Sequence, residues 1–148
     1  MKISKKTPNH VAIVMDGNGT WSIKNNLQKK DGHKKGVKTA KKIISYAADI
    51  GIKNITLFAL SNENLSRSKL ELKNLFDIFF YSFSEEKEYL RDNKIKIRFI
   101  GDLQKLPKKL KEKAFLLENE TKNNKKLNLF IALNYGGKQD IKQAIKNS

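Results

Sequence analysis

The chain has 148 residues, of which 39% are hydrophobic and none is cysteine. This is enough for one domain with a core, and it excludes a disulfide framework and a thiolate metal site. Two histidines far apart in sequence argue against a zinc site. No apolar run approaches the roughly 20 residues that span a bilayer, and the basic N-terminus lacks an apolar stretch of signal-peptide length. We therefore expect a cytoplasmic protein.

The formal net charge of +16 raises nucleic acid as a possible partner. However, the basic residues are almost all lysine, with arginine only at positions 67, 91 and 98. The chain is also rich in Asn and Ile, as expected of an AT-rich coding sequence. No motif for reading base edges is evident, so we expect no sequence-specific nucleic-acid binding. The positive field should still attract phosphorylated substrates.

Hydrophobic periodicity in the first part of the chain predicts two strands and two helices in alternation. Val11–Met15 is a continuous apolar run, typical of a strand covered on both faces. A helix follows over about 34–50 and is stopped by Gly51. Ile55–Leu60 is a second apolar strand. A long helix then reaches about Arg91, with its apolar stripe at Leu72, Leu75, Phe76, Phe79, Phe80 and Phe83.

The second part of the chain repeats the alternation. Residues 95–99 alternate apolar and basic side chains, which predicts a half-exposed strand. Pro107 suits the first turn of a helix, and Leu127–Leu133 is a fourth strand. A last helix is predicted from near Lys138 to Ser148. The order β-α-β-α-β-α-β-α predicts a single α/β domain over residues 1–148 with a parallel sheet and alternating helices.

Polar loops follow each predicted strand. They read "DGNGTW" from Asp16, "SNENLSR" from Ser61, "GD" at 101–102 and "NYGG" from Asn134. In open α/β sheets, ligands bind beyond the C-terminal ends of the strands. The four loops should therefore meet at one edge of the sheet around a polar ligand.

The first loop has a lone carboxylate, Asp16, followed by two glycines. It lacks the third glycine of a dinucleotide fingerprint, and it is not a G-K-[ST] phosphate loop. Bare glycine amides can still form an anion nest, and Mg²⁺ is commonly held by one or two carboxylates plus phosphate oxygens. The pattern suits a magnesium–diphosphate site at Asp16, but the residue types alone do not decide for it. The alternative is that Asp16 only caps a turn.

The motifs "HVAIVMDGNGTW", "GHKKG" at 32–36, "SNENLSR" and "LNYGG" resemble, in order and spacing, those of the cis-prenyltransferase family. The resemblance runs from about Pro8 to the last residue and is strongest to the bacterial undecaprenyl diphosphate synthases. It implies a magnesium-dependent condensation of isopentenyl diphosphate with farnesyl diphosphate, giving a cis-polyprenyl diphosphate. It also implies a homodimer and peripheral contact with the inner face of the membrane through the lipid product.

The resemblance also implies roles for individual residues. Asp16 would handle the metal and help the allylic diphosphate leave, and Asn64 would be the catalytic residue usually named as proton acceptor. A neutral amide is a poor base, so we expect Asn64 to orient a water or a diphosphate oxygen. The implied substrate contacts are Gly17, Asn18, Gly19, Thr20, Trp21, Lys29, His33, Ser61, Asn62, Glu63, Leu65 and Arg67.

The sequence departs from the family pattern in two ways. Thr20 and Lys29 stand where the family has arginines, and Leu65 and Ser68 replace a tryptophan and a proline. More seriously, the family's R-x-G-G-E motif, its groups for isopentenyl diphosphate and a metal-binding glutamate are absent. We therefore expect a C-terminally incomplete domain with an uncovered strand or apolar face. It would be an enzyme fragment that needs a complementing C-terminal chain.

Two other functions remain open from the sequence. One is a noncatalytic remnant that binds diphosphates or a partner chain. The weaker one is a basic nucleic-acid-binding module.

Overall fold

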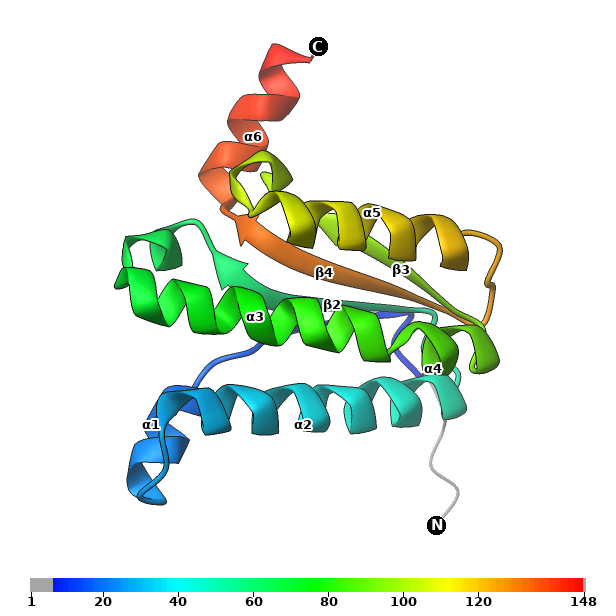
Figure 1. Ribbon diagram of the computed structural model, residues 1–148. Coiled ribbons are helices and arrows are strands. Elements are labelled where there is room, and N and C mark those ends of the chain that lie inside the picture. The colour runs from blue at the N-terminus through cyan, green and yellow to red at the C-terminus, as the bar shows by residue number, and fades with distance from the viewer. Residues whose placement is uncertain (1–6, 148) are drawn as a thin grey trace.

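The computed structural model describes residues 7–147, which form a four-stranded, all-parallel sheet with the strand order β1-β2-β4-β3 (Figure 1). The strands are β1 (His10–Val14), β2 (Asn54–Ser61), β3 (Ile95–Ile100) and β4 (Leu127–Tyr135). The helices are α1 (Asn18–Lys24), α2 (Lys29–Asp49), α3 (Lys69–Glu85), α4 (Lys87–Asp92), α5 (Lys108–Thr121) and α6 (Gly137–Lys146). This confirms the predicted α/β class. The predicted helix end at Ser148 lies outside the described residues.

The core lies between the sheet and the helices α2, α3 and α5, which lie on the same side of it in Figure 1. Alternate residues of the strands point toward these helices because successive side chains of a strand face opposite sides. On the central strands they are almost fully buried, as at Leu57 and Leu129. Phe83 of α3 packs edge-on against Phe99 of β3, with ring centroids 4.8 Å apart.

The opposite face of the sheet carries no helix among the described residues (Figure 1). On β1 this face presents His10, Ala12 and Val14, and Val14 is 69% exposed. The prediction that the first strand is covered on both faces is therefore wrong. An apolar run shows that side chains suit burial, but it does not show which neighbours are present to bury them.

The two edges of the sheet differ. On β3, the backbone N–H groups of Ile97 and Phe99 donate to Thr121 Oγ1 (3.2 Å) and Glu118 Oε1 (2.7 Å) of α5. These side chains satisfy the edge as a neighbouring strand would. The outer edge of β1 has no such partner among residues 7–147. The described part of the chain thus has one edge that is covered by side chains of α5 and one edge that is not.

Three helix predictions need correction. The long helix to Arg91 is divided into α3 and α4 at Glu86. Near this break, Ser82 and Ser84 donate back to the carbonyls of Ile78 and Phe80, a pattern that bends helices. The helix expected over 34–50 begins earlier, at Lys29, where Gln28 and Asp31 form a capping box. The glycine-rich stretch after Asp16 forms the short helix α1, which was expected to be a loop.

The helix α1 exists because it packs closely against α2. A Cβ at Gly32 would lie 2.1 Å from the backbone oxygen of Asn18, and one at Gly36 would lie 2.7 Å from Asn18 Nδ2. Only glycine permits this approach. No helix in residues 7–147 has both the length and the apolar character to cross a bilayer.

The contact of α1 with α2 gives a first prediction. Gly32→Ala should lower the melting temperature by several degrees, as for a loss of about 1–3 kcal/mol, because the backbone of Asn18 must move. Gly137→Ala is the matched control, since a Cβ there meets nothing within 4 Å. Thermal unfolding followed by circular dichroism measures both. Equal melting temperatures for the two variants would contradict the close contact.

Candidate functional site

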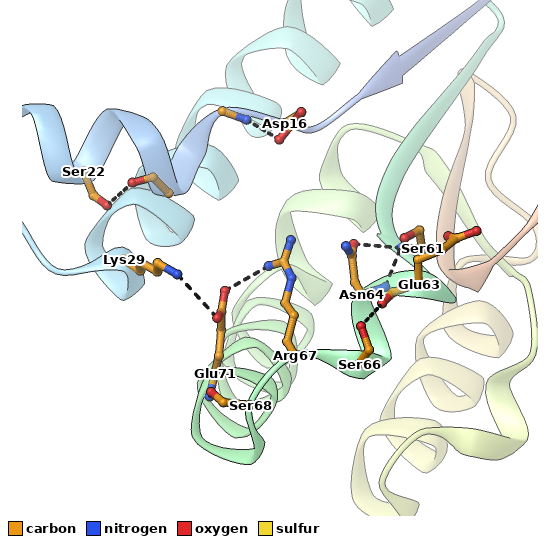
Figure 2. Close-up of polar contacts among 12 residues, drawn as sticks. Asp16, Ser22, Lys29, Ser61, Glu63, Asn64, Ser66, Arg67, Ser68 and Glu71 are labelled. Carbon is orange, nitrogen blue, oxygen red and sulfur yellow. Dashed lines mark hydrogen bonds and ion pairs between the residues drawn. The ribbon is translucent and has the colours of Figure 1, made fainter.

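A cavity of about 500 Å³ opens at the C-terminal edge of β1 and β2, between α1, α2 and α3 (Figure 2). Ten of the fourteen predicted site residues line it. They are Asp16, Gly17, Asn18, Gly19, Thr20, Lys29, His33, Ser61, Asn64 and Arg67. The prediction that the loops after the four strands would share one edge is confirmed, because all four strands are parallel. The later loops also bond to one another at this edge, since the N–H of Asn62 donates to the Tyr135 carbonyl (3.0 Å) and that of Asp102 to the Asn134 carbonyl (3.2 Å). Residues of the "GD" and "NYGG" loops do not line this cavity.

Asp16 leaves the end of β1 with an exposed carboxylate. The backbone N–H of Gly17 donates to its Oδ1 (2.6 Å), and its second oxygen has no hydrogen-bond partner among the described residues. Gly17 is the N-cap of α1 in the left-handed region (φ 83°), and no side chain caps this helix. Asp16 is thus not a helix cap, and it keeps one carboxylate oxygen facing the cavity.

Two cations and a second carboxylate lie across the cavity from Asp16 (Figure 2). Lys29 begins α2, and Arg67 precedes α3. Glu71, in the first turn of α3, pairs with Lys29 Nζ (3.5 Å) and Arg67 Nη1 (3.2 Å). Sequence motifs did not single out Glu71. The three-residue ion cluster appears only when the starts of α2 and α3 are brought together.

His33 lies one turn after Lys29 on α2, and its Nε2 is buried with no hydrogen-bond partner among residues 7–147. Burial lowers the pKa of His33 from its usual 6.5. Arg67 and Lys29 lower this pKa further, while the Glu71 carboxylate opposes them. The imidazole is therefore neutral at pH 7 and can offer a hydrogen bond to the cavity without adding charge.

Ser61, Asn64 and Arg67 share one side of the turn that follows β2. Asn64 belongs to the short 3-10 helix there (Glu63–Ser66), Ser61 and Arg67 flank this helix, and all three line the cavity. The N–H of Ser61 donates to Asn64 Oδ1 (3.2 Å), and the N–H of Asn64 donates to Ser61 Oγ (3.2 Å). These bonds fix the amide of Asn64, with its carbonyl oxygen engaged and its NH₂ group left to donate.

Four predicted contacts do not line the cavity, namely Trp21, Asn62, Glu63 and Leu65. On α1, Thr20 and Ile23 line it, and Trp21 is turned about 100° from Thr20. Glu63 is exposed and Leu65 packs partly against the core. Asn62 packs instead against Gly136, where a Cβ would lie 2.5 Å from its Nδ2.

The inner wall of the cavity is apolar. Val37 of α2 and Leu75, Ile78 and Phe79 of α3 line it. Of the predicted aromatic stripe, Phe79 faces this cavity, whereas Phe76 and Phe80 face a separate groove beside α5. The stripe is thus divided between two sides of α3.

No group of three or more His, Cys, Asp or Glu side chains among residues 7–147 could hold a metal by itself. The free oxygen of Asp16 is nevertheless a hard donor at the open cavity. Mg²⁺ commonly takes only one or two protein carboxylates and completes its shell with water and phosphate oxygens. Asp16 therefore fits a Mg²⁺ ion that is brought with a diphosphate, and does not fit a metal held by protein alone.

The parallel sheet, the glycine loop with its carboxylate and the facing cations define an α/β protein with a charged cavity at one edge of its sheet. Residues 14–148 match the family described as undecaprenyl diphosphate synthase. The chain belongs to this family of prenyltransferases.

Individual relatives agree with the family match. An isoprenyl transferase of Fusobacterium nucleatum is 39% identical over 143 residues, covering 97% of this chain and 62% of that protein. The farnesyl-diphosphate-specific ditrans,polycis-undecaprenyl-diphosphate synthase of Buchnera aphidicola is 42% identical, covering 98% and 58%. A crystal structure of lavandulyl diphosphate synthase from Lavandula x intermedia, in complex with dimethylallyl diphosphate, has a TM-score of 0.92 and 36% identity, covering 95% and 61%. The chain thus spans about three fifths of the length of these proteins.

The surroundings of His33 give a second prediction. Because its folded-state pKa lies below the unfolded value of about 6.5, the unfolded chain binds a proton first. The contribution of His33 to stability therefore falls as the pH drops below 6.5. Histidine NMR titration should give a pKa below 6.5 for His33, and Arg67→Gln should raise it. His10→Gln assigns the two signals. A His33 pKa at or above 6.5 in the native chain would contradict the described burial.

Proposed function

We propose that this chain binds the allylic diphosphate substrate of cis-prenyl transfer in the cavity at the end of β1 and β2. The observation that carries the proposal is the divided chemistry of the cavity. Its polar lining includes Asp16 and, facing it, Lys29 and Arg67, whereas its inner wall has apolar side chains such as Val37 and Leu75. An amphiphile with an anionic head and a hydrocarbon tail matches both sides. Farnesyl diphosphate is our choice because relatives are named as specific for it.

In the proposed reaction, the bond between C1 of the allylic chain and its diphosphate oxygen breaks. The double bond of isopentenyl diphosphate forms a new bond to C1, and a proton leaves to give a cis olefin. Lys29, Arg67 and the backbone N–H of Gly19, in the first turn of α1, would stabilise the negative charge on the leaving diphosphate. Mg²⁺ bound through Asp16 and diphosphate oxygens would supply further charge neutralisation.

The remaining implied roles belong to the same proposal. The NH₂ group of Asn64 would donate to a water or a diphosphate oxygen, because its carbonyl oxygen already accepts from Ser61. Neutral His33 would donate or accept one hydrogen bond beside the phosphates. Thr20 would replace the arginine of the family with a hydroxyl, which gives a weaker contact because it carries no charge.

The second substrate and the partner are also proposals. We propose that isopentenyl diphosphate is held by the part of the domain that relatives carry and this sequence does not include. The open face of the sheet and the unpaired edge of β1 are where such a part could pack, because both offer unsatisfied surface. A homodimer and peripheral membrane contact through the lipid product belong to this complete assembly.

The role of Asp16 gives the direct test. Asp16→Asn should weaken the binding of farnesyl diphosphate in the presence of Mg²⁺ by about tenfold or more, as for losing a charged partner worth about 1.5–3 kcal/mol. The melting temperature should stay within a few degrees, because the exposed carboxylate is not part of the core. Asp77→Asn removes an exposed carboxylate that does not line the cavity and serves as the control. Calorimetric titration measures both. Unchanged affinity for farnesyl diphosphate, or loss of folding, in the Asp16→Asn chain would contradict the proposal.

Elongation separates the enzyme from a noncatalytic diphosphate binder. With radiolabelled isopentenyl diphosphate, farnesyl diphosphate and Mg²⁺, the purified chain alone should make no long-chain product, because positioning both reactants supplies roughly 7–11 kcal/mol of such a barrier. Adding a polypeptide with the R-x-G-G-E segment of a relative should restore product. Long-chain product from this chain alone would contradict the need for that segment. Binding without any restoration would favour the noncatalytic alternative.

A further inference from the structure

Glu71 is the most enclosed charged side chain of the cavity's ion cluster. Its side chain is 23% exposed, against 34% for Arg67 and 55% for Lys29. Its position on α3 is fixed by the cap of that helix, because its N–H donates to Ser68 Oγ (3.2 Å). Each of its carboxylate oxygens has a different cation, as Figure 2 shows: Oε1 faces Arg67 and Oε2 faces Lys29. One carboxylate therefore joins the start of α2 to the start of α3.

We propose that Glu71 is a positioning residue that holds Lys29 and Arg67 at the spacing needed to grip a diphosphate. This inference rests on the proposed function. Long cationic side chains lose conformational entropy when they are ordered. Without a fixed partner, Lys29 and Arg67 would lose this entropy when the ligand binds. A carboxylate that orders both beforehand reduces the loss. This ordering matters more for Lys29 than it would for an arginine at the same position. The lysine ammonium sits on a flexible stem and cannot make the bidentate contact of a planar guanidinium.

The formal charges of the cavity lining distinguish two possible roles of Glu71. The cavity lining holds Lys29 and Arg67 against Asp16 and Glu71, with His33 neutral, so the formal charges cancel. If Glu71 acted only through its charge, it would repel a diphosphate, and removing that charge would tighten binding. If it positions the cations, removing it loosens them and weakens binding. The two roles predict changes of opposite sign.

The experiment uses inorganic pyrophosphate with Mg²⁺ as the probe, measured by calorimetric titration on the full chain. Glu71→Gln should weaken binding by about tenfold, the size expected when charge-assisted bonds that hold two side chains are lost. Glu85→Gln removes the same charge from an exposed position of the same helix, outside the cavity lining, and should leave the affinity unchanged. Glu71→Asp should recover part of the loss. Tighter or equal binding in Glu71→Gln would overturn the inference.

A double-mutant cycle tests the link to Lys29. Lys29→Gln should weaken pyrophosphate binding strongly in the native chain. It should weaken binding much less in the Glu71→Gln chain, because the side chain of Lys29 is no longer held in position there. Full additivity of the two losses would also overturn the inference.

A readout without ligand keeps the inference separate from the proposed function. In the free chain, Glu71→Gln should lower the NMR-measured pKa of His33, because the Glu71 carboxylate raises it while Arg67, Lys29 and burial lower it. A pKa that does not move shows that the cluster is not held as described and overturns the positioning role. If the pKa falls but native chain fails to bind pyrophosphate, the proposed function fails. If the native chain binds pyrophosphate and the Glu71→Gln chain binds it with equal affinity, only the positioning role fails.

Discussion

The close approach of α1 to α2 is the constraint on which the site depends. Asp16 lies two residues before the start of α1, whereas Lys29 and His33 belong to α2. The contact between these helices therefore decides where the carboxylate lies relative to the cations. Gly32 and Gly36 permit it, because neither leaves room for a side chain against Asn18. The two glycines of the "GHKKG" motif are therefore explained by the packing of α1 against α2. The glycines hold the Asp16 loop in place, and the histidine between them faces the cavity that results.

This packing produces a cavity whose lining side chains have formal charges that cancel. Two carboxylates and two cations line it, and burial keeps His33 neutral. Such a site tolerates close charges without a ligand, and Mg²⁺ with a diphosphate brings in a nearly matched pair of opposite charges. The apolar wall of α2 and α3 continues from this polar end. The polar and apolar parts of the cavity lining thus meet along α2 and α3, and the far face of the sheet carries no helix within residues 7–147.

Much of this architecture could be predicted from sequence, because apolar runs of strand length separate helical periodicities and parallel strands deliver their loops to one edge. The short helix α1 could not, since Gly19 disfavours helix and the contact that stabilises α1 is with α2. Glu71 was missed because its partner Lys29 lies on another helix, although its i,i+4 spacing from Arg67 is a local signal that could have marked it. Trp21 was expected at the site and lies outside it, because helical rotation turns it away from Thr20. The open face of β1 depends on absent neighbours, which composition cannot reveal.

The central claim is that the cavity between α1, α2 and α3 is where an allylic diphosphate binds. Chemical-shift mapping of backbone amides with farnesyl diphosphate and Mg²⁺ tests it most directly, because it locates the ligand without requiring turnover. The account predicts the largest shifts at residues 16–20, at His33 and from Ser61 to Arg67, with smaller shifts along Val37 and Leu75. Shifts spread over exposed lysines of α5 with none at Gly17 or His33 would contradict it, and would show attraction by net charge alone.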